Sequence, residues 1–147
     1  MAPEDTGGLK SSPVGTWELV SFTSHLEDGR SIEPWPNAVG RVVYDTSGNV
    51  TGLLISGRRN EADGRSSPPE AQDEFTAYFG TYHVDIAQGV ITHDVSASLS
   101  ATRASKVLRR SFELNDDKLI LGFATMRNGV PMANRLVWKR ISTVRSS

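Results

Sequence analysis

The fold is decided by residues 80–97, which read GTYHVDIAQGVITHDVSA. Apolar and polar side chains alternate with period two on both sides of a short turn, which is the pattern of two antiparallel strands joined as a hairpin. If Asp85 pairs with Val90, then Tyr82 faces His93 across the ladder, and both lie on the more apolar face. A phenol and an imidazole are therefore the polar groups that we expect on this face.

The same alternation recurs along the chain on both sides of this hairpin. Turn-forming residues separate the alternating segments, and this regular spacing is typical of antiparallel strands in consecutive hairpins. Eight such strands close into an up-and-down barrel with room for side chains or one small ligand. We therefore predict an all-β, eight-stranded antiparallel barrel. The predicted strands are residues 16–23, 40–44, 49–55, 82–85, 90–97, 106–114, 118–123 and 134–141.

Two segments between the strands are expected to cover the barrel mouth. In residues 67–79, Ser67 can cap a helix, and Phe75, Tyr78 and Phe79 follow at helical spacing. We predict one short helix there, lying over the mouth. Residues 27–38 contain two prolines and cannot form a central strand, so they form a long loop. This loop carries Trp35, which we expect to join the aromatic residues of the helix in a lid that contacts ligand.

Composition favours one barrel domain over residues 14–142, preceded by a disordered leader at 1–13 and followed by a flexible tail at 143–147. The leader carries acidic residues and lacks an apolar core, so it does not resemble a secretory signal. The chain has no cysteine, and we expect a cytoplasmic location. No apolar run approaches the roughly 20 residues of a membrane span. With a net charge of -1 and dispersed basic residues, we expect no nucleic-acid partner and no membrane partner.

Three inward-facing polar residues are candidate catalytic groups: Tyr82, His93 and Arg110. A phenol beside an imidazole in a dry cavity can move a proton or polarise a carbonyl oxygen. The alternative is that Tyr82 and His93 bond each other as a structural pair. Arg110 shares a face with apolar residues, where a guanidinium needs an anion or another partner, such as a ligand carboxylate, enolate or phenolate. A shift of one residue in register would place Arg109 inward instead.

Aromatic and aliphatic residues of the predicted strands, loop and helix are expected to form the substrate pocket. The strand residues among them also suit an ordinary barrel core. No H-x-H or H-E-x-x-H spacing is present, so we predict no metal site, and nucleotide-binding and hydrolase motifs are missing as well. The expected substrate-binding residues are Trp17, Trp35, Tyr44, Phe75, Tyr78, Phe79, Val95, Phe112, Leu121, Phe123 and Trp138.

Six short motifs are spread along the chain: residues 15–17 (GTW), 40–44 (GRVVY), 80–82 (GTY), 90–93 (VITH), 110–114 (RSFEL) and 136–138 (LVW). Together they resemble the lipocalin-like domain family, a group of intracellular bacterial and fungal calycin-type barrels. The resemblance covers nearly the whole chain after about Pro13. It implies a pocket for an apolar small molecule, and proteins of this kind can act as cyclases, isomerases or dehydratases without a cofactor, sometimes in natural-product pathways.

The leading functional hypothesis is a cofactor-independent enzyme that cyclises or isomerises a small hydrophobic substrate inside the barrel. Binding would hold a reactive conformer while Tyr82, His93 and Arg110 supply hydrogen bonds or proton transfer. The first alternative is a non-catalytic carrier of the same kind of ligand. The second is a structural barrel, which predicts an interior filled with side chains. Fold alone does not choose among them, and the sequence leaves a homodimer open.

Overall fold

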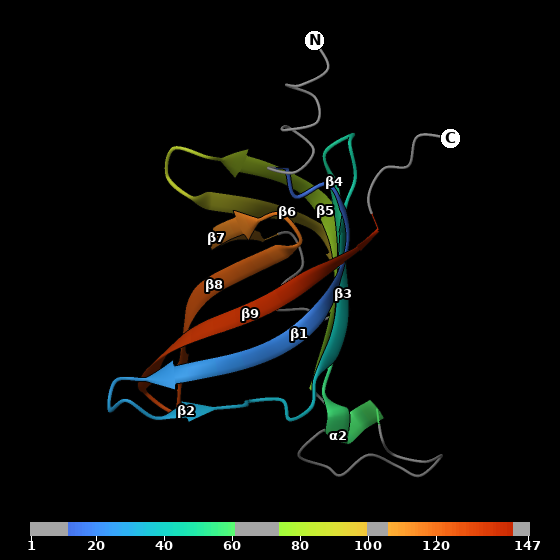
Figure 1. The fold of residues 1–147 in the computed structure, drawn as a ribbon. Coiled ribbons are helices and arrows are strands. Elements are labelled where there is room, and N and C mark those ends of the chain that lie inside the picture. Colours follow the sequence, from blue (N-terminus) through green and yellow to red (C-terminus); the bar gives the residue numbers. More distant parts are fainter. Residues whose placement is uncertain (1–11, 61–73, 100–105, 143–147) are drawn as a thin grey trace.

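The computed structural model describes residues 12–60, 74–99 and 106–142, and most of these belong to β-strands (Figure 1). The four-residue helix α2, Gly57–Asn60, lies beside one end of the strands. The predicted leader and tail lie largely outside the described residues, and residues 67–73 of the predicted helix lie outside them as well. The strands are β1 Gly15–Leu26, β2 Ser31–Ile32, β3 Val39–Tyr44, β4 Asn49–Ile55, β5 Phe75–Asp85, β6 Val90–Ser98, β7 Val107–Asn115, β8 Lys118–Arg127 and β9 Val130–Ser142.

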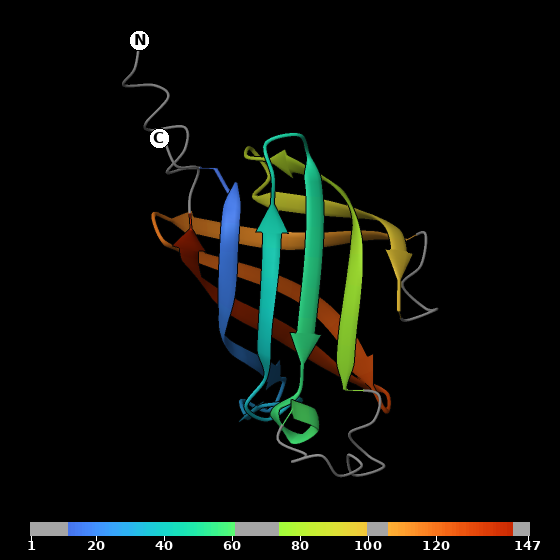
Figure 2. The ribbon, with the colours of Figure 1, turned by 90° about the vertical axis from the view of Figure 1, so that its right-hand side faces the viewer.

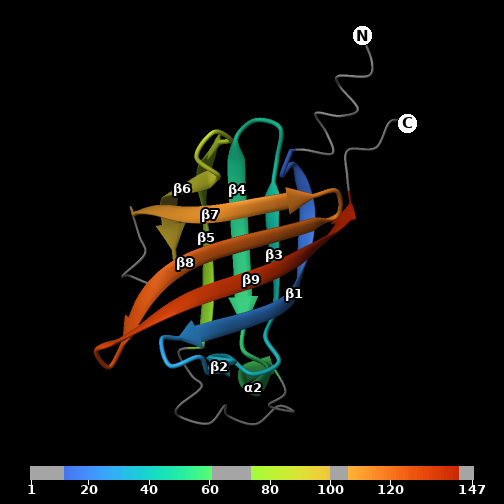
Figure 3. The ribbon, with the colours of Figure 1, turned by 60° about the vertical axis from the view of Figure 1, so that its left-hand side comes forward.

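Eight of these strands form a closed antiparallel barrel. Each strand from β3 to β8 pairs with the next one in the chain, β1 pairs with β3, and β1 also pairs with β9 along nearly its whole length. The two-residue strand β2 adds to the end of β1 outside this circuit. Figure 2 shows β3, β4 and β5 side by side, with β7, β8 and β9 crossing behind them, and Figure 3 shows the crossing from the other side. The predicted eight-stranded barrel is confirmed.

The register of the β5–β6 hairpin is the predicted one. Asp85 pairs with Val90 and Tyr82 pairs with His93. A bulge follows at Gly80, where the pairing slips by one residue. A Cβ atom at Gly80 would lie only 2.0 Å from the carbonyl oxygen of Asp94, so the two backbones approach too closely there for any side chain.

The predicted helix is wrong over residues 75–79, which form the first half of β5. Each of these residues pairs with β4, from Phe75 opposite Ile55 to Phe79 opposite Thr51. A helix here would have left the backbone groups of β4 without partners on that side, whereas the strand satisfies them and continues the barrel. Phe75 and Phe79 consequently point to the outer surface, and Tyr78 points inward.

The two ends of the barrel differ. At one end, the buried Trp17 indole donates a hydrogen bond to the Pro13 carbonyl oxygen at 2.7 Å, and the Arg140 guanidinium lies 4.3 Å from the Trp17 ring centroid. Arg140 also donates to the carbonyl oxygens of Ser12, Val14 and Asp116, which ties this end together. The other end, at the bottom of Figure 1, carries β2, α2 and the β8–β9 turn. The core cluster fills the barrel between them but leaves a cavity towards the second end.

In the described part of the chain, no helix is both long and apolar enough to cross a membrane.

Candidate functional site

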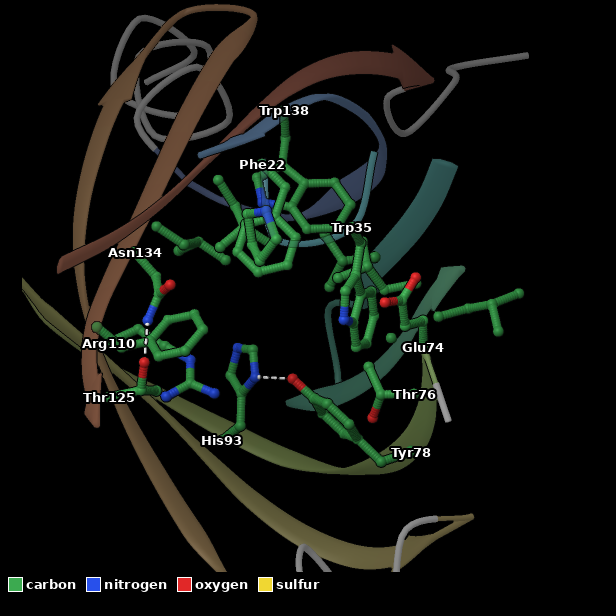
Figure 4. Close-up of a pocket in the computed structure, with 18 of the residues that line it drawn as sticks. Phe22, Trp35, Glu74, Thr76, Tyr78, His93, Arg110, Thr125, Asn134 and Trp138 are labelled. Carbon is green, nitrogen blue, oxygen red and sulfur yellow. Dashed lines mark hydrogen bonds between the residues drawn. The ribbon is translucent and has the colours of Figure 1, made fainter. Parts of the chain in front are cut away.

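A cavity of about 330 Å³ lies inside the barrel (Figure 4). This volume falls at the lower end of the range for small-molecule sites. The interior is therefore not filled by side chains, which contradicts the structural-barrel alternative. Its apolar wall includes Phe22, Trp35, Val42, Leu54, Leu121, Phe123, Met132, Leu136 and Trp138, and its polar wall includes Glu74, Thr76, Tyr78, His93, Arg110, Thr125 and Asn134.

His93 lies between two tyrosine hydroxyls. Its Nε2 atom is 2.7 Å from the Tyr44 hydroxyl of β3, and its Nδ1 atom is 2.7 Å from the Tyr78 hydroxyl of β5. His93 and Tyr44 are each only 1% exposed, whereas Tyr78 is half-buried and lines the cavity. Figure 4 shows Tyr78 on one side of His93 and Arg110 on the other. Both ring nitrogens of His93 thus have hydrogen-bond partners. Of the two tyrosines, Tyr78 is the one that lines the cavity.

Burial sets the protonation states of this group. It lowers the pKa of His93 from its ordinary value of 6.5 to about 3, and the positive charge of Arg110 adds to the effect. Burial also raises the pKa of the Tyr44 phenol well above its ordinary value of 10. Removing a group from water disfavours its charged form in both cases. Near pH 7 the imidazole and the Tyr44 phenol are therefore neutral.

Arg110 brings a positive charge to the cavity. Its guanidinium carbon lies 3.9 Å from the centroid of the Phe123 ring, within the range of a cation–π contact. The side chain lies inward because Arg110 pairs with Ile91, which is fully buried on the same face of the neighbouring strand. This is the orientation that the sequence predicted for Arg110. The guanidinium can donate hydrogen bonds to an anion in the cavity.

A second polar group crosses the wall between β1, β8 and β9. The Ser24 hydroxyl donates to Asn134 Oδ1 at 2.6 Å, and Asn134 Nδ2 donates to the Thr125 hydroxyl at 2.8 Å. Two further buried polar atoms of the cavity wall, Thr76 Oγ1 and Trp138 Nε1, have no hydrogen-bond partner among the described residues. Because a buried polar atom is costly without a partner, both are positions where a ligand or water can bind.

The cavity mouth is built from the loop after β2 and the start of β5. Trp35 packs edge-on against Phe22 with ring centroids 5.8 Å apart. Arg58 Nη2 lies 2.5 Å from Glu74 Oε2, so the acidic side chain at the mouth has a counter-charge. The amide of Gly57 donates to the Pro36 carbonyl oxygen at 2.8 Å, which joins the loop to α2. This geometry agrees with the expected position of Trp35 at the cavity mouth. Its aromatic partner is Phe22 of strand β1, whereas the sequence predicted partners on a helix.

The structure distributes the predicted site residues over three environments. His93 and Arg110 line the cavity, as do five of the expected substrate-binding residues: Trp35, Tyr78, Leu121, Phe123 and Trp138. Trp17, Tyr44, Val95, Phe112 and Tyr82 are buried or half-buried in the barrel without lining the cavity, and Phe75 and Phe79 lie on the outer face of β5.

Tyr82 is displaced from the role that the sequence suggested. Although it pairs with His93 in the ladder, its hydroxyl donates to the Asp45 carbonyl oxygen at 2.8 Å, and its ring packs edge-on against Tyr44. The phenols that bond His93 are instead Tyr44 and Tyr78. The proposed structural pair of Tyr82 and His93 is therefore wrong, because the Tyr82 hydroxyl bonds the Asp45 backbone and not the imidazole.

Sequence reasoning missed Tyr78 as a partner of His93 because it placed Tyr78 on a helix. The signal in the sequence was Gly52, which stands opposite Tyr78 on β4. A Cβ atom at Gly52 would lie 3.4 Å from the Tyr78 ring, so the tyrosine lies flat over the glycine and reaches His93. A glycine within an alternating strand often marks such a close approach.

Among the described residues, no group of three or more histidine, aspartate and glutamate side chains is placed to hold a metal ion.

The comparisons with known proteins agree with the barrel and its cavity. No curated protein matches the chain. The model of the lipocalin-like domain family matches residues 14–141, which include all residues that line the cavity and every strand of the barrel except the last residue of β9. The chain therefore belongs to the lipocalin-like domain family.

Proposed function

We propose that this barrel is a cofactor-independent enzyme that cyclises or isomerises a small hydrophobic molecule in its cavity. The observation that carries the proposal is the convergence of the Tyr78 hydroxyl, bonded to His93, and the Arg110 guanidinium on one cavity of about 330 Å³. A few converging polar groups in a mostly apolar cavity are the arrangement of a reactive-site pocket. The lipocalin-like fold supports binding of a small hydrophobic ligand.

The apolar wall contributes by holding the substrate in one conformer. Aromatic side chains from β1, β8 and β9 surround the space, and Trp35 covers its mouth. Cyclisation and isomerisation need the reacting atoms of one molecule to be held close together, which a shaped pocket supplies by removing conformational freedom before reaction.

The polar groups contribute by stabilising negative charge on a substrate oxygen. The Tyr78 hydroxyl and the Arg110 guanidinium both line the cavity and can donate hydrogen bonds to a substrate oxygen there. An enolate, or a carbonyl oxygen that gains negative charge in the transition state, is stabilised by such donors. Loss of one donor of this kind reduces the turnover number by about 100- to 1000-fold in other enzymes, which sets the expected size of the effect.

The experiment compares the molecular masses of substrate and product. Purified protein is incubated with a small-molecule extract of its source organism and analysed by liquid chromatography with mass spectrometry. Cyclisation or isomerisation yields a product of unchanged mass at a new retention time, and dehydration yields a loss of one water. We expect conversion by the wild type and at least a 100-fold slower conversion by Tyr78→Phe.

A second test variant, His93→Phe, removes the buried imidazole. Its matched control is His83→Phe, because His83 is an exposed residue on the outer face of β5. His83→Phe should convert at the wild-type rate and His93→Phe should not. If His93→Phe and Tyr78→Phe convert the same compound at the wild-type rate, the assignment of the site is wrong.

A carrier is the second candidate, and one observation favours it. The low pKa of His93 and its two hydrogen bonds make the imidazole a poor base near neutral pH. A carrier would release its ligand chemically unchanged. Native mass spectrometry separates the two candidates: a compound that binds and is recovered intact after prolonged incubation, with no converted compound in the extract, supports the carrier.

A further inference from the structure

We infer that the cavity selects a ligand with an anionic oxygen, and that Tyr44 is the positioning residue that makes Tyr78 a hydrogen-bond donor to that oxygen. The inference rests on the proposed function and names the ligand class of the same site. It begins with the chain of contacts from Tyr44 through His93 to Tyr78, in which both hydroxyls lie 2.7 Å from a ring nitrogen.

The direction of the hydrogen bonds in this chain follows from counting protons. A neutral imidazole has one N–H donor and one acceptor nitrogen. Of the two tyrosines, one must therefore donate to His93 and the other must accept from it. Two arrangements are possible, and they differ in whether Nε2 or Nδ1 carries the proton.

The burial of Tyr44 decides between the two arrangements. Its hydroxyl is enclosed, and among the described residues its hydrogen-bond partner is His93 Nε2 alone. If Nε2 carried the proton, the Tyr44 O–H would be a buried donor without an acceptor. Leaving such a donor unsatisfied reduces the population of that arrangement by roughly 5- to 150-fold. Tyr44 therefore donates to Nε2, and the proton of His93 lies on Nδ1.

Tyr78 consequently accepts a hydrogen bond from His93 Nδ1–H. Its own hydroxyl proton is then directed away from His93, whatever else Tyr78 contacts. Because Tyr78 is a half-buried residue of the cavity wall, a ligand oxygen can receive this proton in a hydrogen bond. A ligand group that only donates hydrogen bonds cannot accept the proton that Tyr78 offers.

The charges of the cavity point to the same ligand. The cavity wall has two charged residues among those described: Glu74 lies at the mouth in an ion pair with Arg58, and Arg110 lies over the Phe123 ring beside His93. The inner part of the cavity thus has a positive charge and a phenolic donor. An anionic oxygen gains from both groups, and an ammonium group is opposed by both.

The test compares three probes with the same aromatic body: 2-naphthoate, 2-naphthamide and 2-naphthylmethylammonium, titrated calorimetrically into the full chain. We expect naphthoate to bind at least 10-fold more tightly than naphthamide, and the ammonium probe to bind most weakly. Hydrogen bonds to charged groups are stronger than neutral ones, so Tyr78→Phe should weaken naphthoate binding by about 10- to 150-fold and naphthamide binding by about 2- to 10-fold. Arg110→Gln should abolish the preference for naphthoate. Its matched control Arg109→Gln, an exposed neighbour on the outer face, should keep it.

A second measurement tests the role of Tyr44 without any ligand. Nitrogen-15 NMR of the His93 ring distinguishes the Nδ1–H form from the Nε2–H form, and His93→Gln assigns the signals. We expect the Nδ1–H form to predominate in the wild type by at least 5-fold. Tyr44→Phe should remove this bias and populate both forms, while the protein stays folded. If Tyr44 had only a structural role, its replacement would not change which His93 nitrogen carries the proton.

Each outcome bears on the inference. An Nε2–H imidazole in the wild type, equal affinity for the naphthoate and ammonium probes, or no binding of any probe overturns it. Failure of the proposed function has a different signature, in which naphthoate is selected by the wild type but no compound of the extract is converted.

Discussion

The buried, neutral His93 predicts a dependence of stability on pH that is tied to this single residue. In the unfolded chain the imidazole binds a proton near its ordinary pKa of 6.5, whereas in the folded protein burial lowers this pKa to about 3. Between these values the unfolded state binds more protons than the folded state. The free energy of unfolding must therefore fall as the pH falls from about 6.5 towards 3.

The size of the effect follows from the same two pKa values. One proton contributes up to about 1.4 kcal/mol for each pH unit. Acidification from pH 7 to pH 5 should therefore lower the free energy of unfolding by about 2 kcal/mol, and the full effect down to pH 3 is about 5 kcal/mol. Backbone hydrogen bonds lower the pKa values of the Asp28 and Asp45 carboxyl groups from 3.8, so their stabilisation is lost only as the pH falls to about 4 and below, outside the interval from pH 7 to pH 5.

The assay is urea unfolding followed by tryptophan fluorescence at several pH values between 5 and 7.5, since Trp17 and Trp138 are buried in the folded barrel. With a slope of about 2 kcal/mol per molar urea, the wild-type midpoint should drop by about 1 M between pH 7 and pH 5. The variant His93→Gln cannot titrate but can still bond both tyrosines, so its midpoint should change much less. Its control is His83→Gln on the outer surface, which should retain the wild-type dependence. Equal slopes for the wild type and His93→Gln would refute the reasoning.

Four further changes test the packing of the barrel. Gly80→Ala should lower the free energy of unfolding by about 3 kcal/mol in urea denaturation, because its methyl group would meet a backbone oxygen at 2.0 Å. Gly52→Ala meets the Tyr78 ring at an ordinary 3.4 Å and should cost less than about 1 kcal/mol, so an equally large loss there would contradict the argument from close approach. Tyr82→Phe should cost about 1 kcal/mol for the lost hydrogen bond and leave the dissociation constant of 2-naphthoate unchanged, measured by calorimetry. Arg140→Gln should lower stability by about 2 kcal/mol through its lost carbonyl contacts, and a thermal melt that matches the wild type would argue against that contribution.

The barrel could be predicted from the sequence because strand alternation is a local signal. The pairing of Tyr82 with His93 followed from the turn after Asp85, and the inward position of Arg110 followed from the parity of its strand. These deductions need only the period of the strand and the length of the turn.

The hydrogen bonds of the site could not be predicted in the same way. Tyr44 and His93 are 49 positions apart in the chain, and their contact depends on how the barrel closes and bends. For Tyr78 the local pattern was ambiguous, because Phe75, Tyr78 and Phe79 also fit one face of a helix. The pairing partners offered by β4 decided the matter, and a sequence window does not contain them.

The pairing of β1 with β9 has a consequence for how the cavity forms during synthesis. The ladder joins the first long strand to the last, from Thr16 with Ser142 to Leu26 with Met132, so the contacts that close the barrel have the largest sequence separation in it. Such non-local contacts make folding slow. A nascent chain lacks the wall that carries Met132 and Trp138 until β9 has been synthesised, so ligand capture in the closed cavity can only follow the synthesis of β9.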